Sequence, residues 1–522
     1  MKLSRSFFTI FLSVILGILF LKSVQAQEAP QSDITVPNPQ EVIVPNSPAS
    51  LTDITNPNPQ EINPGVPSEP PIIDREVFER NFPAVTPEEG VEQSEEYHAV
   101  EYSKYLGVQL FGEISSTGEI ADNLNKLAKL TGRNAAVLYV TSLRDKLSLI
   151  LIPPKPEEKD LLNQTKNLNK SDSLLSQESQ VKVGEVVRHF VVDANEKNVQ
   201  KIAREFRSRV TNVRDKSYFI PAQQLYEWIV KPIEPALKIN KIDTLIFSMD
   251  SGLRSLPIAA LYDGKQFIIE KYSVGLIPSF SLTDTRYIPI VKSDILAMGI
   301  SQSTEGQDPL PSVPLEINTV SKELWRNNSQ TLLDQESTLE NLKSLSLQKH
   351  FGILHLATHG DFQPGKIANS YIQIWNRKIH IDQLRELSKE LGWSKEPKVE
   401  MLVLSACKTA VGSYEAELGF SGLAVQAGVK SVLGSLWYVS DQGSLALMTK
   451  FYDQLSTTSL RSESLRQAQL AMVKREVRIT DKELYLSPDK PIALPPELVN
   501  SGKIDLSHPY YWSAFTMIGN WN

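Results

Sequence analysis

One cysteine in the 522-residue chain, Cys407, stands where a buried strand would deliver a nucleophile. It follows the apolar and small residues 403–406, a pattern typical of a buried strand that ends at the edge of a sheet. Upstream, a second apolar run at 351–354 leads into a segment that contains His355 and His359. A lone cysteine with a histidine at the end of another strand is the minimum apparatus for cysteine-nucleophile chemistry.

Of the two histidines, His359 is the better candidate for an acid–base partner of the thiol. A thiol is a modest nucleophile at neutral pH unless a neighbouring base removes its proton. On a strand, His355 would point to the same face as Ile353 and Ala357, towards packing. His359 precedes Gly360, where we expect the chain to leave the strand. We therefore predict His359 as the acid–base and His355 as a core or supporting residue.

Small residues near the cysteine would let backbone amides approach a developing oxyanion, the usual electrostatic device in acyl transfer. We predict the amides of Gly360 and Cys407 as the donors. The glycines that follow, Gly412, Gly419 and Gly422, are equally consistent with simple turns. The sequence does not decide between these two interpretations.

A zinc site is the alternative use of the two histidines. His355 and His359 are four residues apart and would share one face of a helix. However, no Glu follows His355, and the preceding run at 352–354 favours a strand. We therefore predict no metal and no other cofactor.

The N-terminus bears on the structural interpretations of the cysteine. Lys2 and Arg5 precede an apolar stretch at 7–21 and small residues ending at Ala26, the pattern of a secretory signal peptide over residues 1–26. The stretch is shorter than the ~20 residues of a spanning helix, so we predict export to the periplasm or the extracellular space without a stable membrane span. Exported proteins usually form disulfides, but a single cysteine cannot form an intramolecular one. It is a buried apolar residue, an intermolecular crosslink or a working thiol.

Residues 27–95 are rich in Pro, Asn, Ser and acids, and we predict a disordered linker there. The segment 33–41 recurs imperfectly at 53–61. This repeat indicates a spacer that grew by duplication, or a short docking motif.

The globular pattern alternates strands with helices. It predicts helices at 119–130, 199–210, 222–230, 423–427 and 443–455, and strands at 136–140, 147–152, 186–192, 244–247 and 295–299 and through residues 353 and 402. Such alternation indicates an α/β fold with a mostly parallel sheet, in which ligands bind beyond the carboxyl ends of the strands. His359 and Cys407 both fall at that edge. The net charge of −7 argues against nucleic acid as a partner.

Several long motifs in a fixed order resemble the CHAT domain, a caspase-like cysteine peptidase family related to caspases and separases. They include Thr358-His359-Gly360-Asp361 within 354–362 and Ser405-Ala406-Cys407-Lys408 within 404–410, with further segments at 252–261, 416–420, 434–441 and 508–515. The resemblance covers about 215–522 closely and about 120–215 more weakly.

This resemblance implies a caspase-like α/β sandwich of two lobes. An upstream supporting region at 96–214 would precede a CHAT-like domain at 215–522, with its catalytic part at about 291–522. The family's His–Cys dyad maps onto His359 and Cys407. CHAT domains often follow tetratricopeptide repeats, but no period of about 34 residues is visible here, so recruitment of substrate by repeats does not carry over.

Relatives in this clan often hold a basic side chain of the substrate in an acidic pocket. Asp361, Glu417 and Asp441 lie in motifs similar to those of the family and are candidates for such a pocket. Each is also consistent with a surface carboxylate or a helix N-cap, and Asp441, just before a predicted helix, suits a cap.

The sequence therefore predicts an exported cysteine endopeptidase that acts on a protein or peptide. The alternatives are a non-catalytic binding or scaffold protein in a signalling or envelope process, and a redox sensor that forms an intermolecular disulfide through Cys407. The substrate, the oligomeric state, and any need for processing or a ligand stay open.

Overall fold

The computed structural model describes residues 73–110, 114–157, 181–302, 305–325, 329–396, 398–409, 413–458, 460–499 and 504–522. The predicted signal peptide at 1–26 and residues 27–72 of the predicted linker lie outside the described residues. Residues Ser68–Asn522 form one compact unit.

Thirteen strands of the described residues form one sheet in which parallel neighbours predominate. They are β1 (Ala135–Ser142), β2 (Leu147–Ile152), β3 (Val187–Val191), β4 (Thr244–Met249), β5 (Ser273–Ile277), β6 (Ile295–Gly299), β7 (Ser329–Leu333), β8 (Ile353–Phe362), β9 (Tyr371–Ile374), β10 (Arg377–His380), β11 (Met401–Thr409), β12 (Ser431–Ser435) and β16 (Phe515–Gly519). A separate three-stranded sheet contains β13 (Arg478–Ile479), β14 (Glu483–Tyr485) and β15 (Pro491–Ala493).

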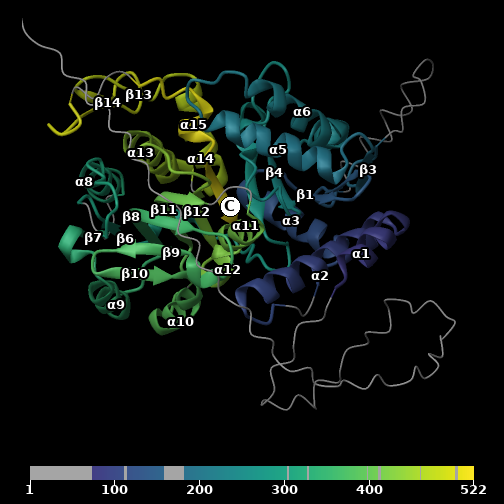
Figure 1. Cartoon of the computed structure of the whole chain (residues 1–522), viewed down its shortest axis with the longest axis horizontal. Coiled ribbons are helices and arrows are strands. Elements are labelled where there is room, and N and C mark those ends of the chain that lie inside the picture. The colour runs from purple at the N-terminus through teal and green to yellow at the C-terminus, as the bar shows by residue number, and fades with distance from the viewer. Residues whose placement is uncertain are drawn as a thin grey trace, which may run out of the picture. The chain divides into compact units, whose positions relative to one another are not determined.

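Helices flank the large sheet on both sides, with α13 and α14 on one side and α10 and α12 on the other (Figure 1). The helices are α1 (Arg75–Asn81), α2 (Pro87–Leu106), α3 (Thr117–Thr131), α5 (Glu196–Val210), α6 (Phe219–Ile229), α7 (Glu234–Ile239), α8 (Val313–Asn318), α9 (Leu339–Gln348), α10 (Ile381–Leu391), α11 (Tyr414–Ser421), α12 (Leu423–Ala427), α13 (Asp441–Thr458), α14 (Arg461–Val473) and α15 (Pro509–Trp512). Among the described residues, no helix combines the length and apolar character needed to cross a bilayer. The predicted α/β fold with a mostly parallel sheet is confirmed.

Both faces of the sheet are buried, as expected for strands covered by helices. Along β1, Leu138 packs in one apolar core with Phe206 of α5, whereas Val137 packs in a second core with Leu124 of α3. Successive side chains of a strand point to opposite faces, so the uninterrupted apolar run of β1 serves two cores.

The strands run in the order β10-β9-β8-β11-β12-β16-β5-β4-β1-β2-β3, and β6 pairs with β8 and β7. β16 pairs antiparallel with β12 and parallel with β5, so it joins the downstream strands to the upstream ones. The two predicted lobes are therefore two ends of one continuous sheet. The predicted boundary at 214/215 is not a structural division, because β1 before it pairs along its length with β4 after it.

The predicted C-terminal boundary of the linker, residue 95, is wrong. Ordered helices begin at α1 and α2, inside the range 27–95. Thr86 and Glu89 form a capping box that starts α2, and Phe82 and Val91 are fully buried against the core that α3 covers. Acidic composition concealed this start, because only a few apolar side chains are needed to bury one face of a helix.

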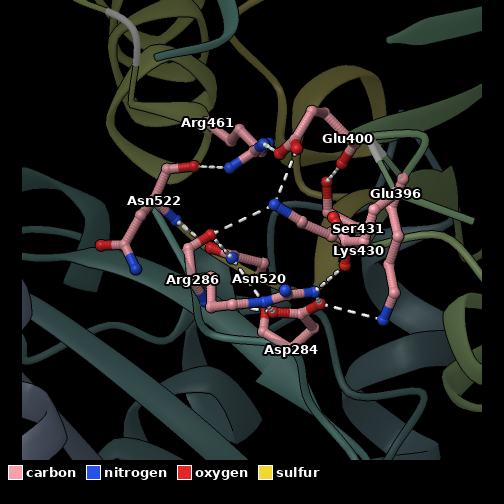
Figure 2. Close-up of polar contacts among 10 residues, drawn as sticks. Asp284, Arg286, Glu396, Glu400, Lys430, Ser431, Arg461, Asn520 and Asn522 are labelled. Carbon is pink, nitrogen blue, oxygen red and sulfur yellow. Dashed lines mark hydrogen bonds and ion pairs between the residues drawn. The ribbon is translucent and has the colours of Figure 1, made fainter. Parts of the chain in front are cut away.

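A buried polar network lies at the amino edge of β11 and β12 and ties them to the segments that follow β5 and β16 (Figure 2). Glu400, which precedes β11, contacts Arg461 Nη2 at 2.6 Å and Lys430 Nζ at 2.7 Å. Arg461 also donates to the carbonyl of Asn522, and Lys430 donates to the carbonyl of Arg286 at 3.5 Å. We call Glu400, Lys430 and Arg461, with these two carbonyls, the amino-edge network.

Candidate active site

The two residues of the predicted dyad lie on adjacent parallel strands near their carboxyl ends. In the register of β8 and β11, His359 pairs with Ala406 and Gly360 pairs with Cys407. Leu356 pairs with Leu404, so β8 has one more residue than β11 over this interval. Such bulges redirect side chains and are common beside active sites.

β8 does not end at Gly360, as the sequence analysis expected. It continues to Phe362, because Gly360 and Asp361 pair with Ile372 and Tyr371 of β9. Glycine within a strand marks a bulge or a close approach of backbones as often as a strand end. His359 therefore lies on a strand that is fixed by neighbours on both sides.

The ring of His359 is half-exposed and held in one orientation. Its Nε2 lies 2.8 Å from the backbone carbonyl of Asp308, in the segment between β6 and α8. A carbonyl oxygen only accepts hydrogen bonds, so Nε2 carries the proton. In the neutral ring the free lone pair is therefore on Nδ1. The arrangement gives His359 a defined basic nitrogen.

Tyr438 covers one face of this ring. The two ring centroids are 5.9 Å apart, with an angle of 19° between the planes. Burial, with added repulsion from the charges of Asp441 and Asp308, raises the pKa of Tyr438 to about 12, so the phenol is neutral at physiological pH. Tyr510 donates its hydroxyl to the Tyr438 carbonyl at 2.9 Å. The motif at 508–515 thus supports the ring that stacks on His359.

His355 belongs to the core, as predicted. It is fully buried, its Nε2 lies 3.0 Å from Glu316 of α8, and its Nδ1 lies 3.1 Å from the hydroxyl of Tyr452 on α13. With both nitrogens used, His355 has no site left for substrate. In the described part of the chain, no group of three or more His, Cys, Asp or Glu residues is arranged to hold a metal ion.

The predicted oxyanion donors lie side by side. Gly360 and Cys407 are paired across β8 and β11, which brings their backbones to the spacing of neighbouring strands, about 4.8 Å. Gly360 is also paired with Ile372 on its other side. Their role as oxyanion donors remains a prediction.

Asp361 shares a face of the sheet with His359. It lies two residues beyond His359 on β8, so both side chains point to the same face of the sheet. Its carboxylate is half-buried and accepts a hydrogen bond from the Gln363 amide at 2.8 Å. One such bond leaves lone pairs of the carboxylate free for a basic group.

Glu417 does not line an open pocket, and this part of the prediction is wrong. Its side chain is fully buried in α11 and accepts hydrogen bonds from the Ser255 hydroxyl and, at 2.9 Å, from the Gly252 amide. Arg207 approaches to 3.9 Å. Gly252 adopts φ +80°, a backbone conformation that favours glycine. Glu417 thus fastens the loop after β4 to α11.

Asp441 does not cap α13, and its carboxylate instead bonds to the segment before α8. Ser440 supplies the cap, since its hydroxyl accepts the Gly443 amide at 3.2 Å. The Asp441 carboxylate accepts the Ser312 amide at 2.7 Å. Burial, reinforced by Glu316 and opposed by the Ser312 bond, raises the pKa of Asp441 to about 6. Asp441 anchors the segment whose Asp308 carbonyl orients His359.

These supporting groups were not found from the sequence. Asp308 acts through its backbone carbonyl, which no residue type reveals. Glu316 and Ser440 also escaped notice, although a Ser before a helix is a common cap and was a usable signal.

Comparisons with known proteins give a family and distant structural neighbours. The model of the CHAT domain matches residues 220–520. No curated protein sequence matches the chain significantly.

Among solved structures, the chain is similar to a chain of the Saccharomyces cerevisiae separase–securin complex, with a TM-score of 0.39 and 10% identity over 86% of this chain and 34% of that chain. It is also similar to the Porphyromonas gingivalis RgpB pro- and mature domains, with a TM-score of 0.33 and 8% identity over 62% of this chain and 76% of that one. This protein therefore covers only 34% of the length of the separase–securin chain. Because the family model covers more than half of the 522 residues, the chain belongs to the CHAT-domain family.

Proposed function

We propose that this protein is an exported cysteine endopeptidase in which Cys407 is the nucleophile and His359 the general acid–base. The observation that carries the proposal is that His359 and Cys407 lie near the carboxyl ends of β8 and β11, two adjacent parallel strands, which is the edge where ligands of such sheets bind. The bond from His359 Nε2 to the Asp308 carbonyl supports it, because it leaves Nδ1 as the basic nitrogen.

In this mechanism, His359 Nδ1 takes the proton of the Cys407 thiol as the sulfur attacks a peptide carbonyl. The tetrahedral intermediate collapses, the carbon–nitrogen bond breaks, and His359 returns the proton to the leaving amine. Water then attacks the thioester, again with His359 as the base, and releases the second product. The Asp308 carbonyl stabilises the imidazolium that forms in each half-reaction.

Substrate binding would use the same edge of the sheet. The amides of Gly360 and Cys407 are the proposed oxyanion donors. Asp361, on the same face of β8 as His359, is the remaining candidate to hold a basic side chain of the substrate. Glu417 and Asp441 are engaged in structural hydrogen bonds and are no longer proposed for that role.

Export is the second part of the proposal and rests on the sequence at 1–26. Secreted protein from the native host should begin at Gln27 when its N-terminus is sequenced. An intact N-terminus at Met1 in the mature protein would contradict export by this signal.

The proposal is tested by profiling a peptide library with mature wild-type protein and with Cys407→Ala. The wild-type protein should cleave, and Cys407→Ala should lose turnover while it keeps its melting temperature. His189→Ala, a histidine change on β3 at the far end of the sheet, is the matched control and should cleave like wild type. Unchanged cleavage by Cys407→Ala would overturn the proposal. Binding of a partner protein without cleavage would favour the scaffold alternative.

A further inference from the structure

A cleft of about 610 Å³ lies beside the segment that orients His359. Its volume falls within the range of about 300–1,000 Å³ that is usual for ligand sites. One wall consists of Pro311, Pro314 and Leu315, at the start of α8, and the other of Ala493, Leu494 and Pro495, at the end of β15. The two walls come from distant parts of the sequence, so the cleft could not be predicted from a local sequence pattern.

The lining favours an apolar side chain. The six wall residues are apolar, Ser301 and Asn318 add two neutral polar groups, and the one charged residue in the lining of the cleft is Glu497, which is exposed. Burial of apolar surface contributes about 25 cal/mol per Å². Glu497 would repel an acidic side chain, so the cleft discriminates against aspartate and glutamate.

The walls are also preformed. Proline fixes φ near −65°, and three of the six wall residues are prolines. The turn that carries Pro311 is tied down by the amide of Leu310, which donates to Ser301 at 2.8 Å, and by the amide of Ser312, which donates to Asp441 at 2.7 Å. A wall that needs no ordering loses little entropy when a ligand binds.

The cleft is close to the candidate active site along the segment between β6 and α8. Asp308, whose carbonyl holds His359, is three residues before Pro311 in the same segment. Three residues of extended chain span at most about 11 Å. A substrate strand advances about 3.3 Å per residue, so a peptide bound at His359 reaches the cleft within about four residues.

We propose that this cleft binds an apolar side chain of the peptide substrate within about four residues of the cleaved bond. The inference rests on the proposed peptidase function and adds a specificity determinant to it. Leu315 and Leu494 form the contact surface for that side chain, and the discrimination comes from desolvation of an aliphatic group.

The test compares the library profiles of wild-type protein, Leu315→Lys and Ala493→Lys. Leu315 is half-buried, whereas Ala493 is exposed, so the second variant keeps the test valid should the first fail to fold. Leu347→Lys on α9, at an exposed leucine outside the cleft, is the matched control and should behave as wild type.

Wild-type protein should prefer Leu, Ile, Val, Phe or Met at one position near the cleaved bond. In both cleft variants, kcat/KM for that peptide should fall about tenfold through KM, with kcat unchanged, and an acidic residue there should become favoured. Wild-type cleavage without an apolar preference at any position near the cleaved bond, or an unchanged profile in folded cleft variants, would overturn this inference and leave the peptidase function standing. A cleft variant that changes the oligomeric state but not the profile would overturn it too. No cleavage by any protein would overturn both.

Discussion

The two edges of the same strands are built in opposite ways. At the amino edge of β11 and β12, the charges of Glu400, Lys430 and Arg461 are fully buried and hold one another. At the carboxyl edge, His359 is half-exposed and is held through a single nitrogen. The amino edge ties neighbouring strands in the middle of the sheet to one another, and the carboxyl edge holds the groups that we propose act on a substrate.

The difference follows from what each edge must do. A buried charge is tolerated when an opposite charge pairs with it, and such pairing favours one arrangement. A reactive group needs an orienting bond and must also keep one donor or acceptor free for chemistry. The comparison predicts that mutations at the amino edge change stability, whereas mutations at the carboxyl edge change activity.

The largest effect on stability is expected for Glu400→Gln. This change leaves Lys430 and Arg461 buried without their shared carboxylate, and breaking a buried pair in this way costs about 3–5 kcal/mol. The free energy of unfolding from denaturant titration measures the loss. Glu396→Gln removes the exposed partner of Arg286 and serves as the control, with little expected change. Equal losses in the two variants would show that the amino-edge network does not stabilise the fold.

The second prediction separates the two histidines of β8. His359→Ala should lower kcat/KM about 10²–10⁴-fold, because the acid–base is removed, with little change in melting temperature. His355→Ala should instead destabilise the protein by about 1–3 kcal/mol, since Glu316 is left buried without its partner. Peptide hydrolysis and thermal unfolding of both variants provide the measurements. A large loss of activity in a stable His355→Ala protein would contradict the assignment.

The third prediction concerns Asp441 as a positioning residue. Asp441→Ala frees the Ser312 amide, and the resulting shift of the Asp308 carbonyl should lower kcat by up to about 100-fold with KM unchanged. Asp441→Asn keeps an oxygen that accepts the same bond and should restore most of kcat. Steady-state kinetics of the pair decide the matter, and a rise in KM alone would instead indicate a substrate pocket.

The smallest effect is a change in the pH dependence of stability. The folded protein keeps the Asp441 proton up to a pKa of about 6, whereas the unfolded chain releases it near 3.8. The stability that this protonated group contributes is complete below pH 3.8 and is lost as the pH rises to about 6. Asp441→Asn has no such proton. The melting temperature of this variant, relative to that of wild type, should therefore rise as the pH increases from 3.8 to about 6. Parallel curves from about pH 4 to about pH 7 would contradict the raised pKa.

Much of the fold could be predicted because apolar periodicity reports burial directly. The strands β1, β2, β4, β6, β8 and β11 and the helices α3 and α5 all appear where the pattern placed them. The helices α1 and α2 do not, because Phe82 and Val91 are few apolar residues in an acidic stretch.

The site was predictable only in part. His355 was assigned to the core from strand alternation, and its two buried partners confirm that assignment. Glu417 and Asp441 were misjudged because a carboxylate in a motif has the same sequence signature whether it binds a substrate or a backbone amide. Asp308 was missed because a carbonyl oxygen belongs to every residue.

The central claim is that His359 activates Cys407, and the reactivity of the single thiol tests it without a known substrate. Alkylation of wild-type protein by a small thiol reagent is measured from about pH 5 to about pH 10, beside His359→Ala and the His189→Ala control. Because the chain has one cysteine, every modified site is Cys407. The account predicts rapid reaction of wild type well below pH 8.5, near which a free cysteine titrates, and a shift of the profile towards about pH 8.5 in His359→Ala alone. Identical profiles in the three proteins, or a thiol that does not react in the folded protein, would contradict the account.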